Sequence, residues 1–478
     1  MATTPADGGQ REPLDVAAFI DRNPIRPAQL NIFGLCLAVS ILDGFDTMVM
    51  SFLAPAISSD WRTSPAAFGM VFAATLLGGA FGATACGLLA DRFGRKTLIL
   101  ASVAWFSVLT LGCAMANRID VLIALRFLAG VGLGGAIPNV LALAGEYAPA
   151  RHRSTVVSVV TWGTPLGAVV GGLVTSPMIE TWGWRSVLLL AGLVPILLWP
   201  LLLATLPESV RFMALRQDAR ERLVKVLARI APHETISLDA TPVTAERGPQ
   251  HAGVSALFRD GLAAGTILLS GAMFMSLVLS FFLVNWTPTL LKQAGLPLKS
   301  AILGTIVLNL SGVIGSLFIA RLVDGKANAP RLLGLTYVGA IIAVIAAGVV
   351  TRSGGAHLLP VLICLAASGF LLIGSQIVLS AFITDFFPTA VRATGVGLNN
   401  AFARFGSLLG PVVGGVLLGA GVGPSQLLIG SALPGGLSAA CLFILAAQRQ
   451  YRRRPASAAP ETCAAETHAA ARIQGKSA

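Results

Sequence analysis

The stretch Ile41-Leu42-Asp43-Gly44-Phe45-Asp46-Thr47-Met48 places two carboxylates inside an apolar run, residues 29–53, that is long enough to cross a membrane. A charged side chain at the centre of a bilayer costs roughly 2.5–3.5 kcal/mol on the mildest scale, so such residues usually have a function. Asp43 and Asp46 share one helix face, and Gly44 leaves room beside them for a helix or a ligand. We therefore expect this face to line a polar cavity.

The composition of the whole chain is that of an all-α polytopic membrane protein. Charged residues make up 12% of the 478 residues, apolar residues 55%, and the mean hydropathy is +0.78, whereas soluble domains carry roughly 25% charged residues. The sequence predicts about twelve spans, each near 20 residues or longer, at residues 29–53, 66–90, 97–116, 119–147, 154–177, 184–205, 262–291, 299–322, 331–350, 357–386, 391–418 and 425–447.

A long hydrophilic interruption divides these spans into two groups of six. The predicted organisation is a cytoplasmic amino-terminal segment (1–28), a first six-helix half (29–206), a cytoplasmic linker (207–260), a second six-helix half (261–447) and a disordered cytoplasmic tail (448–478). Within the linker, residues 208–230 have the pattern of an amphipathic helix lying on the inner membrane surface.

The distribution of Lys and Arg predicts the orientation of the chain. Placing both termini in the cytoplasm puts most basic residues on the inner face, including 92–96, 211–229 and 449–454. The net charge of +12 is then mainly a topology signal, and the dispersed basic residues argue against nucleic-acid binding. No cleavable signal peptide is visible, and the six cysteines lack a C-x-x-C pair, so we expect them to be packing residues.

An internal repeat relates the two halves. Glu146-Tyr-Ala-Pro149 followed by Arg153 recurs as Asp385-Phe-Phe-Pro388 followed by Arg392, and both the acid and the Arg are displaced by 239 residues. Two such halves around a site at the membrane midplane suit alternating access.

The loop between the second and third spans, Gly87-Leu-Leu-Ala-Asp91-Arg92-Phe-Gly94-Arg95-Lys96, is the strongest motif in the chain. Its acid, its bases and its glycine-containing turn could lock loop charges against helix ends in one conformation, so Gly87, Asp91, Arg92, Gly94 and Arg95 are predicted to form a conformational latch. The spacing resembles the signature loop of the major facilitator superfamily. The matching position of the second half, Asp324-Gly325-Lys326, is degenerate, and Asp324 joins the predicted latch with Asp385 and Arg392.

Within that superfamily, Asp43-Gly44-Phe45-Asp46-Thr47 together with Gly134-Gly135-Ala-Ile-Pro138-Asn139 resembles the aromatic acid:H+ symporter family. The resemblance implies a bacterial inner-membrane carrier, expected to be a monomer, that imports a benzoate- or hydroxybenzoate-type acid with protons. Family members can carry a functional His just beyond the Asp324 position; Asn328-Ala329-Pro330 stands here instead, so no such role transfers.

Four ionisable residues are candidates for proton coupling. Asp43 is the leading candidate for reversible protonation, and Asp46 is either a second one or its tuning partner. The alternative is a permanent ion pair with Arg126, which the resemblance assigns to coupling. Glu146 completes the set; with Arg153, Asp385 and Arg392 it could form charge networks at the inner mouth, or these groups could simply be solvated at loop edges.

Substrate recognition is predicted to centre on Arg404 in the eleventh span, because a guanidinium binds a carboxylate through two parallel hydrogen bonds. The alternative is that Arg404 reaches a helix end at the inner surface. A flat apolar slot with a few donors would hold the aromatic ring, and the available residues, which could equally be packing residues, are Trp162, Phe282, Asn285, Trp286, Asn309 and Asn400.

Other function classes fit less well. The five histidines fall in loops, the linker or the tail without metal-ligand spacing, and no nucleophile motif occurs, so we expect neither an enzyme nor a metal or cofactor. Transport of another small organic acid remains an alternative function, and so does drug/proton export. A transport-like sensor fits less well, because no signalling domain is seen in the linker or tail.

Overall fold

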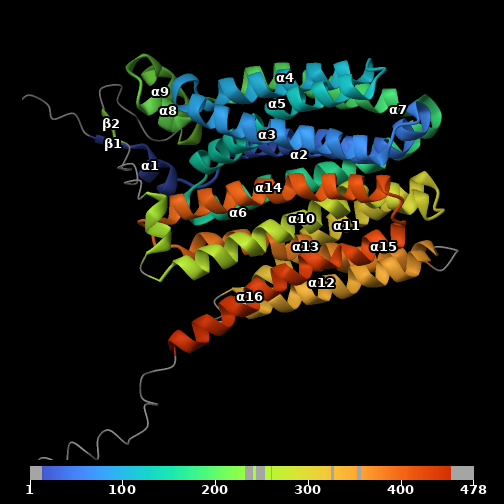
Figure 1. The fold of residues 1–478 in the computed structure, drawn as a ribbon. Coiled ribbons are helices and arrows are strands. Elements are labelled where there is room, and N and C mark those ends of the chain that lie inside the picture. Colours follow the sequence, from blue (N-terminus) through green and yellow to red (C-terminus); the bar gives the residue numbers. More distant parts are fainter. Residues whose placement is uncertain are drawn as a thin grey trace, which may run out of the picture.

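The computed structural model describes residues 13–231, 241–243, 253–259, 261–324, 328–352 and 357–453. Long helices dominate this part of the chain and run alongside one another in a single elongated bundle (Figure 1). The first half of the bundle contains α2 (Pro27–Trp61), α3 (Pro65–Phe93), α4 (Arg95–Ala114), α5 (Ile119–Tyr147), α6 (Ala150–Thr161) and α7 (Gly163–Thr205).

The second half repeats this plan after the linker. Its helices are α10 (Ala263–Gln293), α11 (Leu298–Val323), α12 (Ala329–Arg352), α13 (Leu358–Phe386), α14 (Arg392–Gly419), α15 (Pro424–Gly430) and α16 (Ala432–Arg453). The repeat predicted from sequence has a structural counterpart, because Glu146 and Asp385 are each the penultimate residue of their helices, α5 and α13.

Eleven helical segments in the described ranges are long and apolar enough to cross a membrane. One of them, Ala150–Ala214, spans 65 residues and is broken at Gly183, which has φ 75°. Before Gly183 the chain follows α2 from Ser40 towards Asp60, and after it the chain returns along α4 towards Lys96. This segment therefore crosses twice, which gives the predicted twelve crossings.

Glycines allow close packing inside each half. A Cβ on Gly78, Gly82 or Gly134 would overlap the backbone of the facing helix, so α3 and α5 approach more closely than larger residues would permit. The same holds for Gly315 and Gly369, where α11 meets α13.

The two halves contact each other mainly at one end of the bundle, the end that contains the α2–α3 turn. There Ser51 Oγ donates to the carbonyl oxygen of Val284, 2.9 Å away, and Phe72 meets Trp286 edge to face with ring centroids 5.3 Å apart. Gly69 of α3 lies against Pro411 and Gly415 of α14. We call this region the closed end and the opposite end, where α1 and α9 lie, the linker end.

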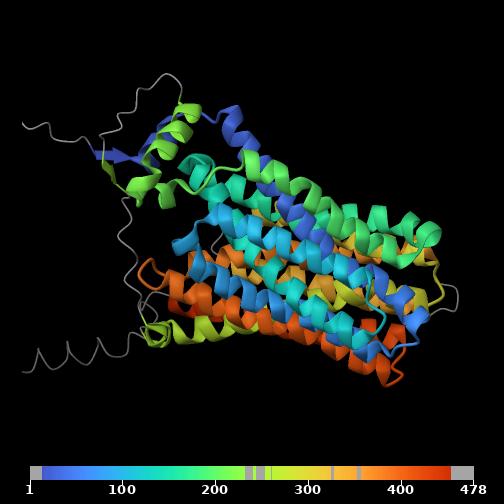
Figure 2. The same ribbon diagram turned by 90° about the horizontal axis from the view of Figure 1, so that it is seen from above.

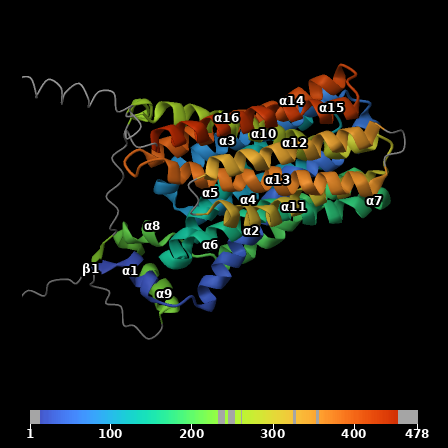
Figure 3. The same ribbon diagram turned by 90° about the horizontal axis from the view of Figure 1, so that it is seen from below.

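Short elements gather at the linker end: β1 (Pro13–Asp15), α1 (Val16–Arg22), α8 (Val210–Ala214), η1 (Gln217–Ala219), α9 (Arg220–Ile230), β2 (Thr241–Val243) and η2 (Val254–Phe258). β1 and β2 pair in parallel. Figures 2 and 3 show β1, α1, α8 and α9 as a group that extends beyond the ends of the long helices.

Two sequence expectations need adjustment here. The single amphipathic helix over 208–230 is instead α8, η1 and α9, and its apolar side (Leu223, Leu227 and Ile230) is buried in a cluster with Phe19 and Ile20 of α1 rather than turned to lipid. α16 continues to Arg453, past the expected start of the tail at 448. The rest of the tail with its expected disorder, the Gly325-Lys326 pair, and residues 232–240, 244–252 and 260 of the linker lie outside the described residues.

Candidate functional site

Asp46 and Arg126 form a buried ion pair between α2 and α5. Arg126 Nη2 lies 3.1 Å from Asp46 Oδ2 and donates to the Asp46 carbonyl oxygen at 2.7 Å, and Thr110 Oγ1 donates to Asp46 Oδ1 at 2.6 Å. The side chain of Asp46 is 1% exposed and that of Arg126 is 0% exposed. The sequence predicts a role of Asp46 in proton coupling, and a permanent ion pair with Arg126 is the alternative. This conformation contains the ion pair.

Asp43 has different surroundings although it is only one helical turn away. Its side chain is buried, and in the described part of the chain no hydrogen bond or ion pair involves it. The charged groups that act on it electrostatically are Asp46 and Arg404. Gly44 packs directly against the backbone of Thr164 in α7, so the room that the sequence predicted beside the carboxylates is filled by a helix. Asp43 is therefore a buried carboxylate without a fixed partner.

Arg404 brings a positive charge from the second half towards the first. It lies on α14, which packs between α10 and α3, and its Nη1 lies 4.0 Å from where a Cβ on Gly79 would be. The side chain is exposed, and within the described ranges no carboxylate is within ion-pair distance of it. The guanidinium can therefore accept a carboxylate, and Asp43 is the acid close enough to act on it.

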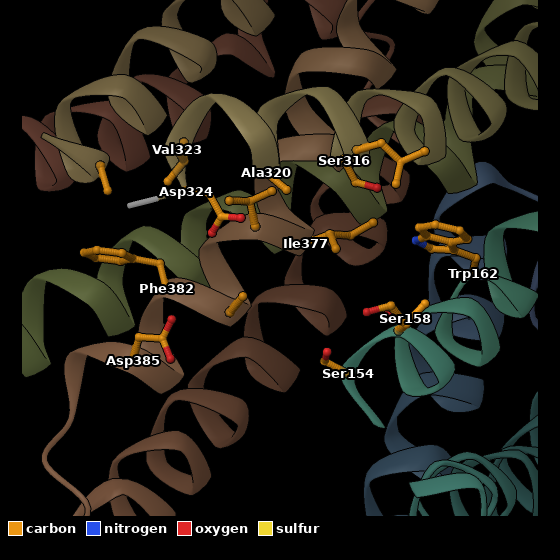
Figure 4. Close-up of a pocket in the computed structure, with 15 residues that line it drawn as sticks. Ser154, Ser158, Trp162, Ser316, Ala320, Val323, Asp324, Ile377, Phe382 and Asp385 are labelled. Carbon is orange, nitrogen blue, oxygen red and sulfur yellow. The ribbon is translucent and has the colours of Figure 1, made fainter. Parts of the chain in front are cut away.

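A cavity of about 490 Å³ opens between the halves on the linker side (Figure 4). Ser154, Ser158 and Trp162 of the first half line one wall, and Phe382 and Asp385 of α13 lie opposite them. Asp324, at the end of α11, also lines it. The cavity thus combines hydroxyl groups, aromatic rings and two carboxylates, and it contains Trp162 from the predicted substrate set.

Four other predicted substrate residues, on α10 and α11, are buried in helix packing. Trp286 donates its indole N–H to the Pro411 carbonyl at 2.9 Å, and Phe282 packs against Gly410 and Gly414. Asn285 and Asn309 each donate to a carbonyl one turn earlier in their own helix, at 2.8 and 2.9 Å. Asn400 is exposed on α14. A substrate role for these residues stays a prediction; their present contacts are structural.

Glu146 lies apart from Asp43, in a network at the linker end. Arg95 Nη1 lies 2.6 Å from Glu146 Oε1, and Ser209 Oγ donates to Glu146 Oε2. Glu208 Oε1 accepts the backbone N–H groups of Lys96 and Ser209, both at 2.9 Å. The network ties the α3–α4 turn to α5 and to the start of the linker. Glu208 and Ser209, in the run Pro207-Glu208-Ser209-x-Arg211 at the start of the linker, are functional candidates that were not among the predicted site residues.

The remaining latch residues are distributed over both halves. Asp91 and Arg92 are exposed, and the Arg92 carbonyl accepts from Arg216 at 3.0 Å. A Cβ on Gly87 would meet open space. Arg392 donates to the Phe387 carbonyl, 3.3 Å away, at the start of α14. The latch thus divides into an engaged part, Arg95 with Glu146, and an exposed part around Asp91. In the described residues, His, Cys, Asp and Glu do not gather into a group that could hold a metal ion.

Comparison with known proteins agrees with this architecture. The family model of the Major Facilitator Superfamily matches residues 35–377. The chain belongs to the major facilitator superfamily. It is thus a multi-pass membrane protein of a transporter family and not an enzyme. Among solved structures, it resembles an inward open conformation of the xylose transporter XylE from E. coli, with 18% identity, a TM-score of 0.65, and coverage of 87% of this chain and 96% of that chain.

Its curated relatives transport aromatic acids. The chain is 38% identical to the 4-hydroxybenzoate transporter PcaK of Pseudomonas aeruginosa over 91% of this chain and 96% of that protein. It is 36% identical to a gallate transporter of Pseudomonas putida over 94% and 98%. The benzoate transport protein of Acinetobacter baylyi is 29% identical over 93% and 95%. The predicted resemblance to the aromatic acid type of this superfamily is confirmed.

Proposed function

We propose that this protein imports a monocyclic aromatic carboxylate together with protons by alternating access. The observation that carries the proposal is the pair Asp43, from the first half, and Arg404, from the second, whose side chains have no hydrogen-bond or ion-pair partner among the described residues. The two opposite charges influence each other across the interface of the halves. The names of the relatives indicate the benzoate and hydroxybenzoate class of substrate.

The coupling follows from competition for one cation. A buried carboxylate is costly to ionise, and the positive charge of Arg404 offsets only part of that cost for Asp43 while no substrate is bound. A substrate carboxylate that binds Arg404 supplies a second negative charge, so Asp43 is more stable when it takes up a proton. One proton carried with one monoanion is electroneutral, whereas a second proton would add about 2.3 kcal/mol per 100 mV of membrane potential. Asp46 is held by Arg126, which favours Asp43 as the site of exchange.

We further propose that the protein works as a monomer in the bacterial cytoplasmic membrane, with both termini and the linker end in the cytoplasm. The excess of Lys and Arg in the loops of the linker end supports this orientation. The cavity beside Trp162 then opens inward, and the packed closed end faces outward.

Uptake by purified protein in proteoliposomes, driven by an imposed pH gradient, tests the proposal. We expect accumulation of 4-hydroxybenzoate, gallate or benzoate and poor uptake of short aliphatic acids. Arg404→Ala should raise the half-saturating substrate concentration at least tenfold, about 1.4 kcal/mol, and Arg404→Lys, which keeps the charge but not the two-pronged geometry, should recover part of the loss. Equal uptake of aromatic and aliphatic acids, or wild-type affinity of Arg404→Ala, would contradict it.

A further inference from the structure

A large groove on the outer surface of the first half is not part of the transport pathway described above. It has a volume of about 1110 Å³ and is bounded by α4, the end of α7, α8 and α9. Figure 1 shows α8 and α9 beside the end of α4. The groove lies where α4 begins, at Arg95, and where α7 ends, at Thr205. In a membrane it would therefore straddle the boundary between acyl chains and headgroups.

The rim of the groove is strongly basic. Asp218 and Glu208 are its acids, and Glu208 already accepts two backbone N–H groups. Six basic side chains line it, which are Arg92, Lys96, Arg216, Arg222, Lys225 and Arg229. The last three follow one another at helical spacing on one face of α9 and are exposed. In the described part of the chain no ion pair involves them.

The floor of the groove is apolar and continuous with the membrane-facing surface. It contains Leu100, Ala101 and Ala104 of α4 and Trp199 and Leu203 of α7. Ala101 and Leu203 are exposed, and Trp199 donates its indole N–H to the Leu100 carbonyl at 3.0 Å, which fixes the ring across the floor. Leu193, Leu197 and Leu201 continue the exposed apolar surface of α7. A ligand seated here meets cations at one end and hydrocarbon at the other.

We propose that this groove is a binding site for an anionic phospholipid, with the phosphate near the basic face of α9 and an acyl chain along Ala101 and Leu203. The charge pattern fits a phosphodiester headgroup, and the apolar floor fits an acyl chain, which free phosphate lacks. Because the apolar side of α9 is buried against other parts of the protein, its basic side remains available for the lipid, which then links the linker to α4 and α7. The inference is independent of the transported substrate.

Native mass spectrometry of the full-length protein tests the site with added diphosphatidylglycerol as the probe. The triple variant Arg222→Gln, Lys225→Gln, Arg229→Gln keeps helix-forming residues and should bind at least about fivefold less lipid. The matched control removes three exposed charges away from the groove, with Arg259→Gln at the end of the linker and Arg321→Gln and Arg331→Gln in the second half, and should retain the wild-type amount. Thermal unfolding of both variants checks that they are folded.

A second variant leaves the charge unchanged. Ala101→Trp fills the floor of the groove and should also reduce the bound lipid, while inorganic phosphate in excess should not displace it. Equal losses in the triple variant and its control, full retention by Ala101→Trp, or displacement by phosphate alone would each overturn the proposal, since each would indicate a diffuse charge effect or a simple anion site.

Discussion

At the residue scale, Asp43 and Asp46 are neighbours on α2 with opposite surroundings, and their substitution should separate stability from coupling. Asp46→Asn removes the partner of the fully buried Arg126, and loss of one member of a buried pair costs about 3–5 kcal/mol. Asp43→Asn breaks no hydrogen bond or ion pair in the described structure. We therefore expect Asp46→Asn to lower the midpoint of thermal unfolding strongly and Asp43→Asn to change it little.

Asp43→Asn, which should hardly change thermal stability, should have a strong effect in the transport assay. Asp43→Asn should abolish accumulation driven by a pH gradient and retain part of the substrate exchange across proteoliposome membranes, because exchange needs no net proton movement. Accumulation by Asp43→Asn, or equal destabilisation by both substitutions, would contradict the roles assigned to them.

The sequence identified these charged residues and offered an ion pair with Arg126, but it could not decide which aspartate forms that pair. The spacing of Asp43 and Asp46 puts both on one helix face. Which of them meets Arg126 depends on how α2 is rotated against α5 and α14, and neither local spacing nor composition determines that rotation. For the same reason residue type alone predicts Trp286 and Asn309 for a substrate slot, while in this conformation both donate to backbone carbonyls; their substrate role stays a prediction.

At the element scale, the turn between α3 and α4 depends on a glycine. Gly94 has φ 88°, which side-chain-bearing residues adopt at a cost of about 1–3 kcal/mol, and a Cβ there would overlap the carboxylate of Glu208. Gly94→Ala should therefore lower the free energy of unfolding and displace Glu208 from Lys96 and Ser209. Thermal unfolding measures the first effect.

Gly87 is the matched control within the same motif. It lies in α3 with open space around the position of a Cβ, so Gly87→Ala should be neutral or stabilise the helix by about 0.5–1 kcal/mol. Equal destabilisation by the two substitutions would mean that the turn conformation is not what Gly94 contributes.

Helix boundaries were largely predictable, because span length and apolar composition are local properties; residues 119–147 were predicted and α5 is Ile119–Tyr147. The partner of α9 was not predictable in this way. An apolar stripe opposite basic residues has the same pattern whether it faces lipid or protein, and only the burial of Leu223 and Leu227 in a cluster of protein side chains distinguishes the two.

At the scale of the whole molecule, the two halves are held together at the closed end and apart at the other. Close approach of α3 and α14 requires glycine on both sides, since a Cβ on Gly69 would lie 3.0 Å from the Pro411 carbonyl oxygen and 3.3 Å from the Gly415 Cα. Alternating access requires this contact to open when the cavity beside Trp162 closes. The stability of the contact therefore sets the balance between the two states.

Gly69→Leu should shift that balance away from the structure described here. The larger side chain cannot fit between α3 and α14, so the closed end should open and the cavity should narrow. In a cysteine-free background, a thiol introduced at Ser158 should then react more slowly with a polar reagent, by about tenfold for each 1.4 kcal/mol of destabilisation of the present state. Gly34→Leu is the control, because nothing lies near a Cβ at Gly34. An unchanged rate for Gly69→Leu would show that the α3–α14 contact does not hold the cavity open.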